Sequence, residues 1–166
     1  IPKNEKTYEN GYKEKHSIYN GTVVTATITY KMLKDLSIRG EETQICKSPL
    51  SAEKFNLKIY GESKVILNEV NFGELHTKLY GESTLEIKAG TIKEQSYTSY
   101  GESTINTSAV NGRTGRITSY GEADFTMNVS DRIKVTAFGD AKLHYKGDPE
   151  IVKGLHIGDM LIDKMD

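Results

Sequence analysis

Tyr60-Gly61-Glu62-Ser63 decides the fold of this chain, because the phrase returns on a fixed period. It recurs as Tyr80-Gly81-Glu82-Ser83, as Tyr100-Gly101-Glu102-Ser103 and as Tyr120-Gly121-Glu122-Ala123, and in altered form as Phe138-Gly139-Asp140-Ala141. The glycines step by 20, 20, 20 and then 18 residues. A sustained period near 20 residues is the signature of a repeat architecture, in which each unit is one rung stacked on the next.

Weaker copies of the repeat extend in both directions. Gly21 and Gly40 precede the clear copies, and Gly158-Asp159 follows them, at similar spacings. Terminal rungs usually diverge because they cap the stack against solvent and against edge-to-edge aggregation. We therefore expect a polar N-terminal lead-in over residues 1–16 and a single domain over residues 17–166, with clear repeats over 55–146 and a capping rung at each end.

Within each repeat, apolar and small residues alternate with polar ones, which is the strand signature. Counting by twos from Leu57 gives an inward face that is apolar at both ends and small at Gly61 and Ser63. Small residues at the same place on every rung predict a bend or a close approach of backbone. Clusters of turn residues separate these runs, and we expect turns there. They are Asn68–Gly73, Ala89-Gly90, Asn111–Gly115 and Ser130-Asp131.

No ten-residue window after Glu53 shows an apolar period of 3.6 residues, so a repeat that contains a helix is not expected. One long strand and one shorter strand fill about 20 residues. The sequence therefore predicts an all-β fold, a single-stranded parallel β-helix (β-solenoid) whose rungs of about 20 residues stack at about 4.8 Å.

Composition excludes several classes of partner. The net charge is −1 and no basic run resembles a nucleic-acid-binding stripe, so we expect no nucleic acid partner. The sequence shows neither a transmembrane stretch nor a signal peptide, and it begins at Ile1, so we expect membrane contact only through an N-terminal anchor outside it. The single cysteine, Cys46, excludes an internal disulfide; we expect a small buried hydrophobe rather than a reactive thiol or a dimer bridge.

The glycine-centred rung and the ending of the chain resemble a known family. Tyr145-Lys146-Gly147-Asp148-Pro149, followed by Gly158-Asp159, is similar to the C-terminal part of the GIN domain, the auto-transporter adhesin head domain of Bacteroidetes-type bacteria. That family typically carries Gly-Ser-Gly at the rung centre, where this chain has Tyr-Gly-Glu-Ser. The resemblance implies a right-handed β-helix and export to the cell envelope, cell surface or periplasm of a Gram-negative bacterium, often as a lipoprotein. It brings no catalytic residues.

An aromatic row is the first candidate binding surface. Tyr60, Tyr80, Tyr100 and Tyr120, with Phe138 in the last copy, should stack on one outward face at a spacing of one rung. A row of amphipathic rings can pack against sugar faces and offer hydroxyl groups to sugar hydroxyls. The alternative is that the stacked rings only stabilise the coil, as cross-strand pairs do, and the loss of the hydroxyl at Phe138 fits this alternative slightly better.

An acidic row is the second candidate surface. Glu62, Glu82, Glu102 and Glu122, with Asp140, should lie beside the aromatic row, and like charges on adjacent strands repel. A bound cation, a basic partner or nearby lysines could offset the repulsion; the lysines are Lys58, Lys64, Lys78 and Lys142. A linear row supplies converging oxygen ligands poorly, so we expect splayed, solvated glutamates, no metal site and no cofactor.

Enzymatic activity is a weaker hypothesis than a binding function. Pairs of carboxylates at glycosidase spacings arise by accident in any acidic row. The four histidines (His16, His76, His144, His156) fall in different rungs at unrelated offsets, and no compact group of Arg, Lys and His stands out. The segment Asn111–Arg116 is a basic turn that either contacts an anionic polymer or is simply solvated.

These observations predict a non-catalytic exported envelope domain, an adhesin that contacts a carbohydrate or surface ligand through the Tyr and Glu rows. The competing interpretation is a scaffolding domain that binds an extracellular or envelope protein, or that forms homo-oligomers through the edges of the coil. A polysaccharide-active enzyme is the third.

Overall fold

The computed structural model describes residues 6–9, 12–15 and 26–166. The chain divides into two compact units, residues 1–31 and residues 32–166. In the first unit β1 (Lys6–Glu9) pairs antiparallel with β2 (Tyr12–Lys15), within the segment expected to be a polar lead-in. The weak repeat at Gly21 lies outside the described residues.

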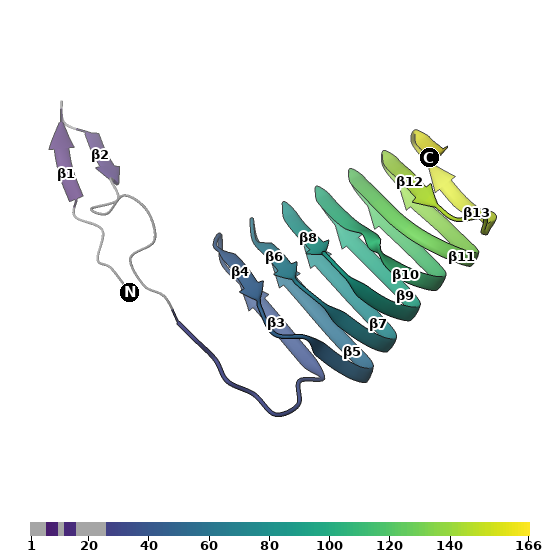
Figure 1. Ribbon diagram of the computed structural model, residues 1–166. Coiled ribbons are helices and arrows are strands. Elements are labelled where there is room, and N and C mark those ends of the chain that lie inside the picture. Colours follow the sequence, from purple (N-terminus) through teal and green to yellow (C-terminus); the bar gives the residue numbers. More distant parts are fainter. Residues whose placement is uncertain (1–5, 10–11, 16–25) are drawn as a thin grey trace. The chain divides into compact units, whose positions relative to one another are not determined.

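The second unit is the predicted parallel β-solenoid, and it has about six turns (Figure 1). Its strands are β3 (Asp35–Arg39), β4 (Thr43–Cys46), β5 (Leu50–Tyr60), β6 (Lys64–Leu67), β7 (Val70–Tyr80), β8 (Ser83–Ile87), β9 (Gly90–Tyr100), β10 (Ser103–Tyr120), β11 (Ala123–Phe138), β12 (Ala141–Lys146), β13 (Glu150–Ile157) and β14 (Met160–Lys164). Every strand pair in this unit is parallel, and the described residues contain no helix. None of them could therefore cross a membrane as a helix.

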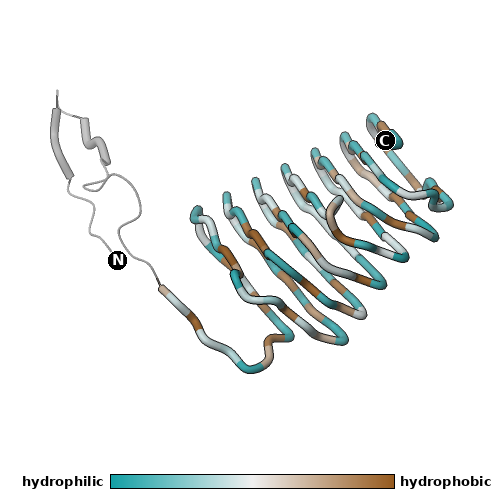
Figure 2. The backbone as a smooth tube through the Cα atoms, in the orientation of Figure 1, coloured by the Kyte–Doolittle hydropathy of each residue, from teal (hydrophilic) through white to brown (hydrophobic). Residues whose placement is uncertain are grey.

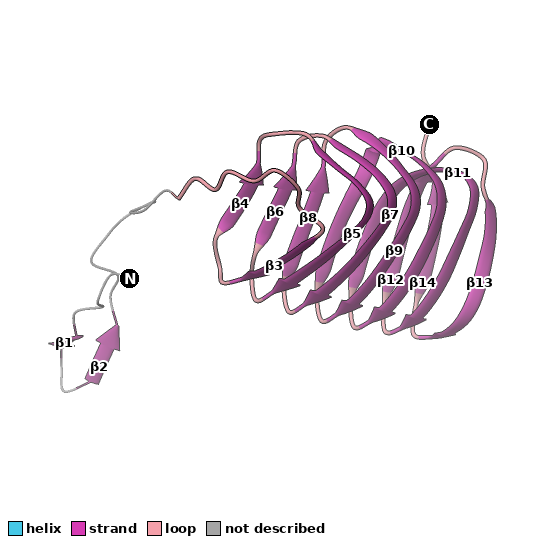
Figure 3. Cartoon of the chain, turned by 90° about the horizontal axis from the view of Figure 1, so that it is seen from below, coloured by secondary structure: helices cyan, strands magenta, loops and turns pink. Residues whose placement is uncertain are grey.

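The register stacks equivalent residues of successive repeats in columns. β5 pairs with β7 so that Tyr60 faces Tyr80, and β7 pairs with β9 so that Tyr80 faces Tyr100. Long strands pair with long strands from β5 through β7 to β9, and short strands pair with short strands from β4 through β6 to β8 (Figure 3). In β10 and β11 the short and the long part of a turn are one continuous strand, so β10 pairs with both β8 and β9. Because the period of the sequence equals one turn, a residue type that recurs every 20 positions forms a continuous row on the surface or in the core.

The core lies inside the coil, on the face that the alternation predicts. Leu57, Ile59 and Val65 are buried, and so are their equivalents in the next four repeats down to Leu143. Hydrophobic positions recur at the same places on successive turns in Figure 2. At Glu53 and Lys54 two consecutive residues are exposed, so the alternation changes phase and the long strand bends to form a further side of the coil.

The repeated glycine marks a corner between the long and the short strand. Gly121 has φ +116°, a backbone conformation that residues other than glycine rarely adopt. A Cβ atom at this position would lie 2.7 Å from the carbonyl oxygen of Gly101. Gly101 is exposed, so the glycines sit at the corner and not in the core column. The small residue is needed because the backbone of the neighbouring rung, rather than an opposite wall, occupies the space.

Two predicted turns are wrong, and a third is shorter than predicted. Asn111–Gly115 lies within β10 and Ser130-Asp131 lies within β11, whereas the turn that begins at Asn68 ends at Glu69 because β7 begins at Val70. The backbone of β10 is paired with β9 and β11, which keeps it extended despite its turn-type residues. Register shifts between Thr107 and Gly112 and between Gly112 and Thr114 show that the glycine marks a β-bulge instead of a reversal.

A polar cluster interrupts the apolar core in the middle of the stack. The hydroxyl of Tyr97 donates a hydrogen bond to Oε1 of Gln95 at 2.8 Å, and Thr107 donates to the same oxygen at 3.2 Å. Burial raises the pKa of Tyr97 well above its usual value.

Cys46 was expected to be a buried hydrophobe, but it is half-buried near the N-terminal edge of the coil. Its thiol donates a hydrogen bond to the carbonyl oxygen of Ser48.

Candidate functional site

The aromatic row forms an ordered stack, which we call the tyrosine ladder (Tyr60, Tyr80, Tyr100, Tyr120). Successive ring centroids are 4.7, 5.0 and 5.0 Å apart with interplanar angles of 5°, 6° and 2°, and Phe138 continues the stack 5.1 Å beyond Tyr120. At the other end the guanidinium carbon of Arg39 lies 4.4 Å from the centroid of the Tyr60 ring. The sequence therefore predicted the stack correctly.

Stacking at this distance decides what the rings can offer to a ligand. Tyr100 has a ring on each face, so neither face can pack against a sugar unless the stack opens. Tyr100 nevertheless remains 40% exposed, which means that the ring edge reaches solvent. The geometry supports the packing role that was the alternative for these rings and leaves the edges and hydroxyl groups as the part available for recognition.

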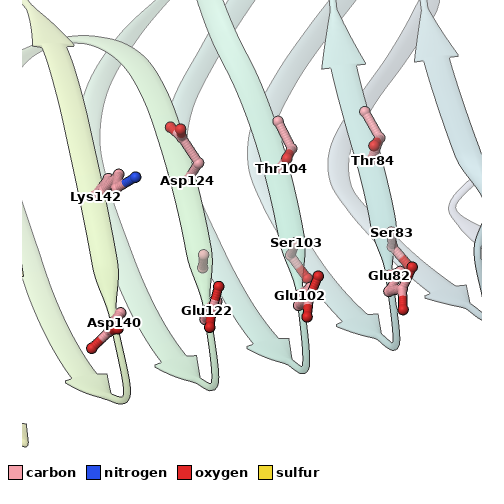
Figure 4. A pocket seen from close by; sticks show the side chains of 11 residues that line it. Glu82, Ser83, Thr84, Glu102, Ser103, Thr104, Glu122, Asp124, Asp140 and Lys142 are labelled. Atoms are coloured by element: carbon pink, nitrogen blue, oxygen red, sulfur yellow. The ribbon is translucent and has the colours of Figure 1, made fainter. Parts of the chain in front are cut away.

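The acid ladder (Glu62, Glu82, Glu102, Glu122) lies on the corner that follows each tyrosine. From Glu82 onward it borders a groove of about 480 Å³ that also includes Asp140. In Figure 4 these carboxylates form one row at the corners, and Thr84, Thr104, Asp124 and Lys142 form a second row farther along the short strands. The full lining is Glu82, Ser83, Thr84, Glu102, Ser103, Thr104, Glu122, Ala123, Asp124, Asp140 and Lys142. We call this surface the ladder groove.

The carboxylates of the acid ladder have no partners among the described residues. No hydrogen bond or ion pair joins any of the four glutamates to another described side chain. The lysines proposed to offset the charge (Lys58, Lys64, Lys78, Lys142) make no ion pair with them either. Only Asp140, at the end of the row, accepts a hydrogen bond, from the backbone N–H of Asp159 at 3.1 Å. The groove is therefore lined by free hydrogen-bond acceptors.

The serine of the repeat has a structural role that the sequence did not reveal. The hydroxyl of Ser63 donates to the carbonyl oxygen of Gly40 at 2.7 Å, and Ser83 donates to that of Gly61 at 3.0 Å. Each bond ties a corner to the preceding rung from the inside. In these two copies the serine braces the turn that presents the glutamate beside it, whereas the hydroxyl of Ser103 is buried without a partner and the next copy has Ala123.

The remaining candidates are scattered. His76 pairs with Glu74 at 3.1 Å and His144 with Asp163 at 3.8 Å, on different rungs, while His16 lies outside the described residues. Within the described part of the chain, no three Asp, Glu, His or Cys side chains are grouped so that they could hold a metal ion. The two ladders are the only predicted site residues that the fold brings together in this part of the chain, in two adjacent rows.

Several solved bacterial proteins share this fold. The chain matches solved structures of a putative adhesin from Bacteroides fragilis (TM-score 0.72, 22% identity, 80% of this chain and 61% of that chain) and a putative lipid binding protein from Parabacteroides distasonis (0.67, 19%, 81% and 62%). A putative adhesin from Parabacteroides merdae matches with TM-score 0.53 and 23% identity, over 81% of this chain and 64% of that chain. This chain thus spans less than two thirds of the length of each.

These identities establish the fold and nothing further. A search of curated proteins found no match. The model of the family described as "Putative auto-transporter adhesin, head GIN domain" matches residues 7–149, which is most of the chain. The protein therefore belongs to the family of auto-transporter adhesin head GIN domains.

Proposed function

We propose that the protein is a non-catalytic, exported cell-envelope domain, and that its ladder groove binds a hydroxyl-rich carbohydrate as the surface ligand. Membership of an adhesin-head family and the likeness to putative adhesins support an adhesin-type role. The identity of the ligand class rests on the chemistry of the two ladders.

The unpartnered row of carboxylates is the observation that carries the proposal. Like charges on neighbouring strands destabilise a sheet, yet four glutamates follow one another here and none of them forms an ion pair with a described lysine or arginine. Ionised carboxylates only accept hydrogen bonds, so they suit a ligand that presents several donors. The hydroxyl groups of a neutral sugar are such donors, whereas an anionic polymer would be repelled from this groove.

The tyrosine ladder adds a second row of polar atoms. Its hydroxyl groups both donate and accept, so they complement sugar hydroxyls beside the carboxylates. The rows run along the stack, with about 4.8 Å between rungs, so an extended oligosaccharide lying along the groove would meet a carboxylate on each turn. The tyrosines lie outside the groove lining, so their hydroxyl groups would be reached only by the part of the ligand that extends over the corner. Each contact is weak, and the binding energy would accumulate over several rungs.

Two triple variants separate recognition from packing. In the first, Tyr80, Tyr100 and Tyr120 become Phe, which keeps the stack and removes the hydroxyls. In the second, Glu82, Glu102 and Glu122 become Gln, which keeps the shape and removes the charge. On an array of glycans and extracellular-matrix proteins, the proposal expects wild-type binding to a neutral glycan that both variants weaken by at least about tenfold.

A matched control tests whether charge alone matters. The triple variant of Glu53, Glu69 and Glu94 to Gln removes the same charge outside the ladder groove and should bind as the wild type does. If no neutral glycan binds, or if the ladder variants bind like this control, the proposed function is wrong. Far-UV circular dichroism verifies that each variant is folded.

A scaffolding role is the second candidate, because the last rung presents apolar side chains outward. Leu155, Ile157 and Leu161 are exposed on the C-terminal strands β13 and β14. Such residues suit a protein partner or a second copy of the chain at the coil edge. Sedimentation equilibrium of the wild type and of a Leu155→Ser, Ile157→Ser variant tests it: a self-association that the variant loses favours scaffolding, and a monomer that binds glycans favours recognition.

A further inference from the structure

A second groove lies near the start of the long strand β9 and beside the bulge in β10, whereas the ladder groove lies at the corners that follow the ends of the long strands. It has a volume of about 490 Å³. Its lining residues are Thr91, Lys93, Asn111, Gly112, Arg113, Asn128, Ser130, Gly147 and Asp148. We call it the bulge groove. It contains the first half of the segment Asn111–Arg116, whose basic character the ladders leave unexplained.

Two cations stand side by side in this groove. Ile92 pairs with Gly112 and Glu94 pairs with Thr114, so Lys93 and Arg113 occupy neighbouring positions on adjacent strands. Among the described residues Lys93 has no ion pair, and Nε of Arg113 lies 3.6 Å from Oδ2 of Asp131. No hydrogen bond of the Arg113 guanidinium to a described residue accompanies this ion pair. An anionic group bridging Lys93 and Arg113 would relieve their repulsion and form charge-assisted hydrogen bonds.

Uncharged polar side chains surround the two cations, and their hydrogen bonds to one another determine which groups remain as donors and which as acceptors. Nδ2 of Asn128 donates to Oδ1 of Asn111 at 3.3 Å, so the amide nitrogen of Asn111 keeps its own hydrogens for a ligand. Oγ1 of Thr91 donates to Oδ1 of Asn71 at 3.0 Å, so Thr91 retains its lone pairs as acceptors. Donors and acceptors in this arrangement match sugar hydroxyls.

The charge balance of the groove remains favourable to an anion. The one carboxylate of the lining, Asp148, lies 3.2 Å from Nζ of Lys164, which offsets its charge. Gln95 lies beneath Gly112, on the inner side of the groove, and is only 2% exposed. Its Nε2 atom is a buried hydrogen-bond donor without a partner. A Cβ atom on Gly112 would collide with this nitrogen, so the amide lies directly against the bulge and adds positive potential beneath it.

We propose that the bulge groove binds an acidic oligosaccharide, with its anionic group between Lys93 and Arg113 and its hydroxyls on Thr91, Asn111 and Asn128. The site is separate from the ladder groove and has the opposite charge preference. The domain would thus contact a neutral glycan on one side and an acidic one on another. The two proposals stand independently, since neither set of residues lines both grooves.

The test titrates the full chain with trigalacturonic acid as the probe and follows binding by calorimetry and by amide NMR shifts. The wild type should bind, with shifts concentrated at Thr91, Asn111 and Asn128. The double variant Lys93→Gln, Arg113→Gln should bind at least about tenfold more weakly, because two charge-assisted contacts are lost. The variant Asp131→Asn releases Arg113 and should bind more tightly.

The controls use the same protein and related probes. A Lys58→Gln, Lys78→Gln variant removes the same charge beside the ladders and should bind as the wild type does. Neutral galactotriose and inorganic sulfate should bind much more weakly than the acidic trisaccharide.

Four outcomes would overturn the proposal: no binding of the trisaccharide at millimolar concentration, equal binding by the Lys93→Gln, Arg113→Gln variant, equal loss in the Lys58→Gln, Lys78→Gln control, or sulfate or galactotriose binding as tightly as the acidic trisaccharide. The ladder variants should leave this titration unchanged, so failure here is distinct from failure of the proposed function.

Discussion

Replacing Tyr100 by Ala should reveal how much the tyrosine ladder stabilises the coil. Its ring stacks on Tyr80 and on Tyr120, with both centroids 5.0 Å away. Aromatic pairs contribute about 0.5–1.5 kcal/mol each, so two lost stacks cost about 1–3 kcal/mol. The ring is 40% exposed, and the loss of its buried part adds about 1–2 kcal/mol at about 25 cal/mol per Å². The free energy of unfolding should therefore fall by about 2–5 kcal/mol.

The assay is urea and thermal unfolding followed by circular dichroism. For a domain of this size, about 2–5 kcal/mol corresponds to a melting temperature lower by roughly 5–20 °C. Tyr100→Phe is the matched control, because it keeps both stacks and should stay within about 0.5 kcal/mol of the wild type. Phe138→Ala, which loses one ring neighbour, should cost less than Tyr100→Ala. A Tyr100→Ala variant as stable as the wild type would refute the view that stacking supports the coil.

Three further predictions concern the corner, the acid ladder and the core. Gly121→Ala should cost at least about 2 kcal/mol in urea unfolding, because φ is +116° and the neighbouring carbonyl blocks the Cβ atom, whereas Glu122→Ala should change stability by less than about 0.5 kcal/mol; equal effects would contradict this. Glu102→Gln should stabilise slightly at low salt, and the gain should vanish at 1 M NaCl if it reflects repulsion along the ladder. The raised pKa of Tyr97 favours its neutral form, so this contribution to stability is present below the unfolded pKa of about 10 and is lost as the pH rises beyond it. Ultraviolet titration should show a late ionisation, coincident with alkaline unfolding, that Tyr97→Phe removes.

The fold was predictable because the period in the sequence is the period of the coil. Once Tyr60, Tyr80 and Tyr100 were aligned, the columns of the core followed by alternation, and the structure buries nearly all of them. The alternation survives the corner because the turn of glycine and glutamate has two residues, which keeps the inward phase. Local pattern and global register agree here, so each supports the other.

Other features were not predictable because pairing with neighbouring strands overrides local propensity. Asn111–Gly115 has the composition of a turn, yet pairing with β9 on one side and β11 on the other keeps it extended. The turn-forming residues disturb the strand only locally, at the bulge around Gly112. The bulge groove depends on that irregularity, which no period in the sequence shows. The sequence predicts that the tyrosine rings form a row. Only the distances between the rings show that each ring covers the face of the next.

The most direct test of the central claim is an amide hydrogen-exchange footprint of a neutral glycan bound to the wild-type chain. If the ladder groove is the binding site, protection should appear at the corners around Glu82, Glu102 and Glu122 and on the short strands beside them. Protection confined to the bulge groove or to the C-terminal strands β13 and β14, with the corners unchanged, would contradict the account.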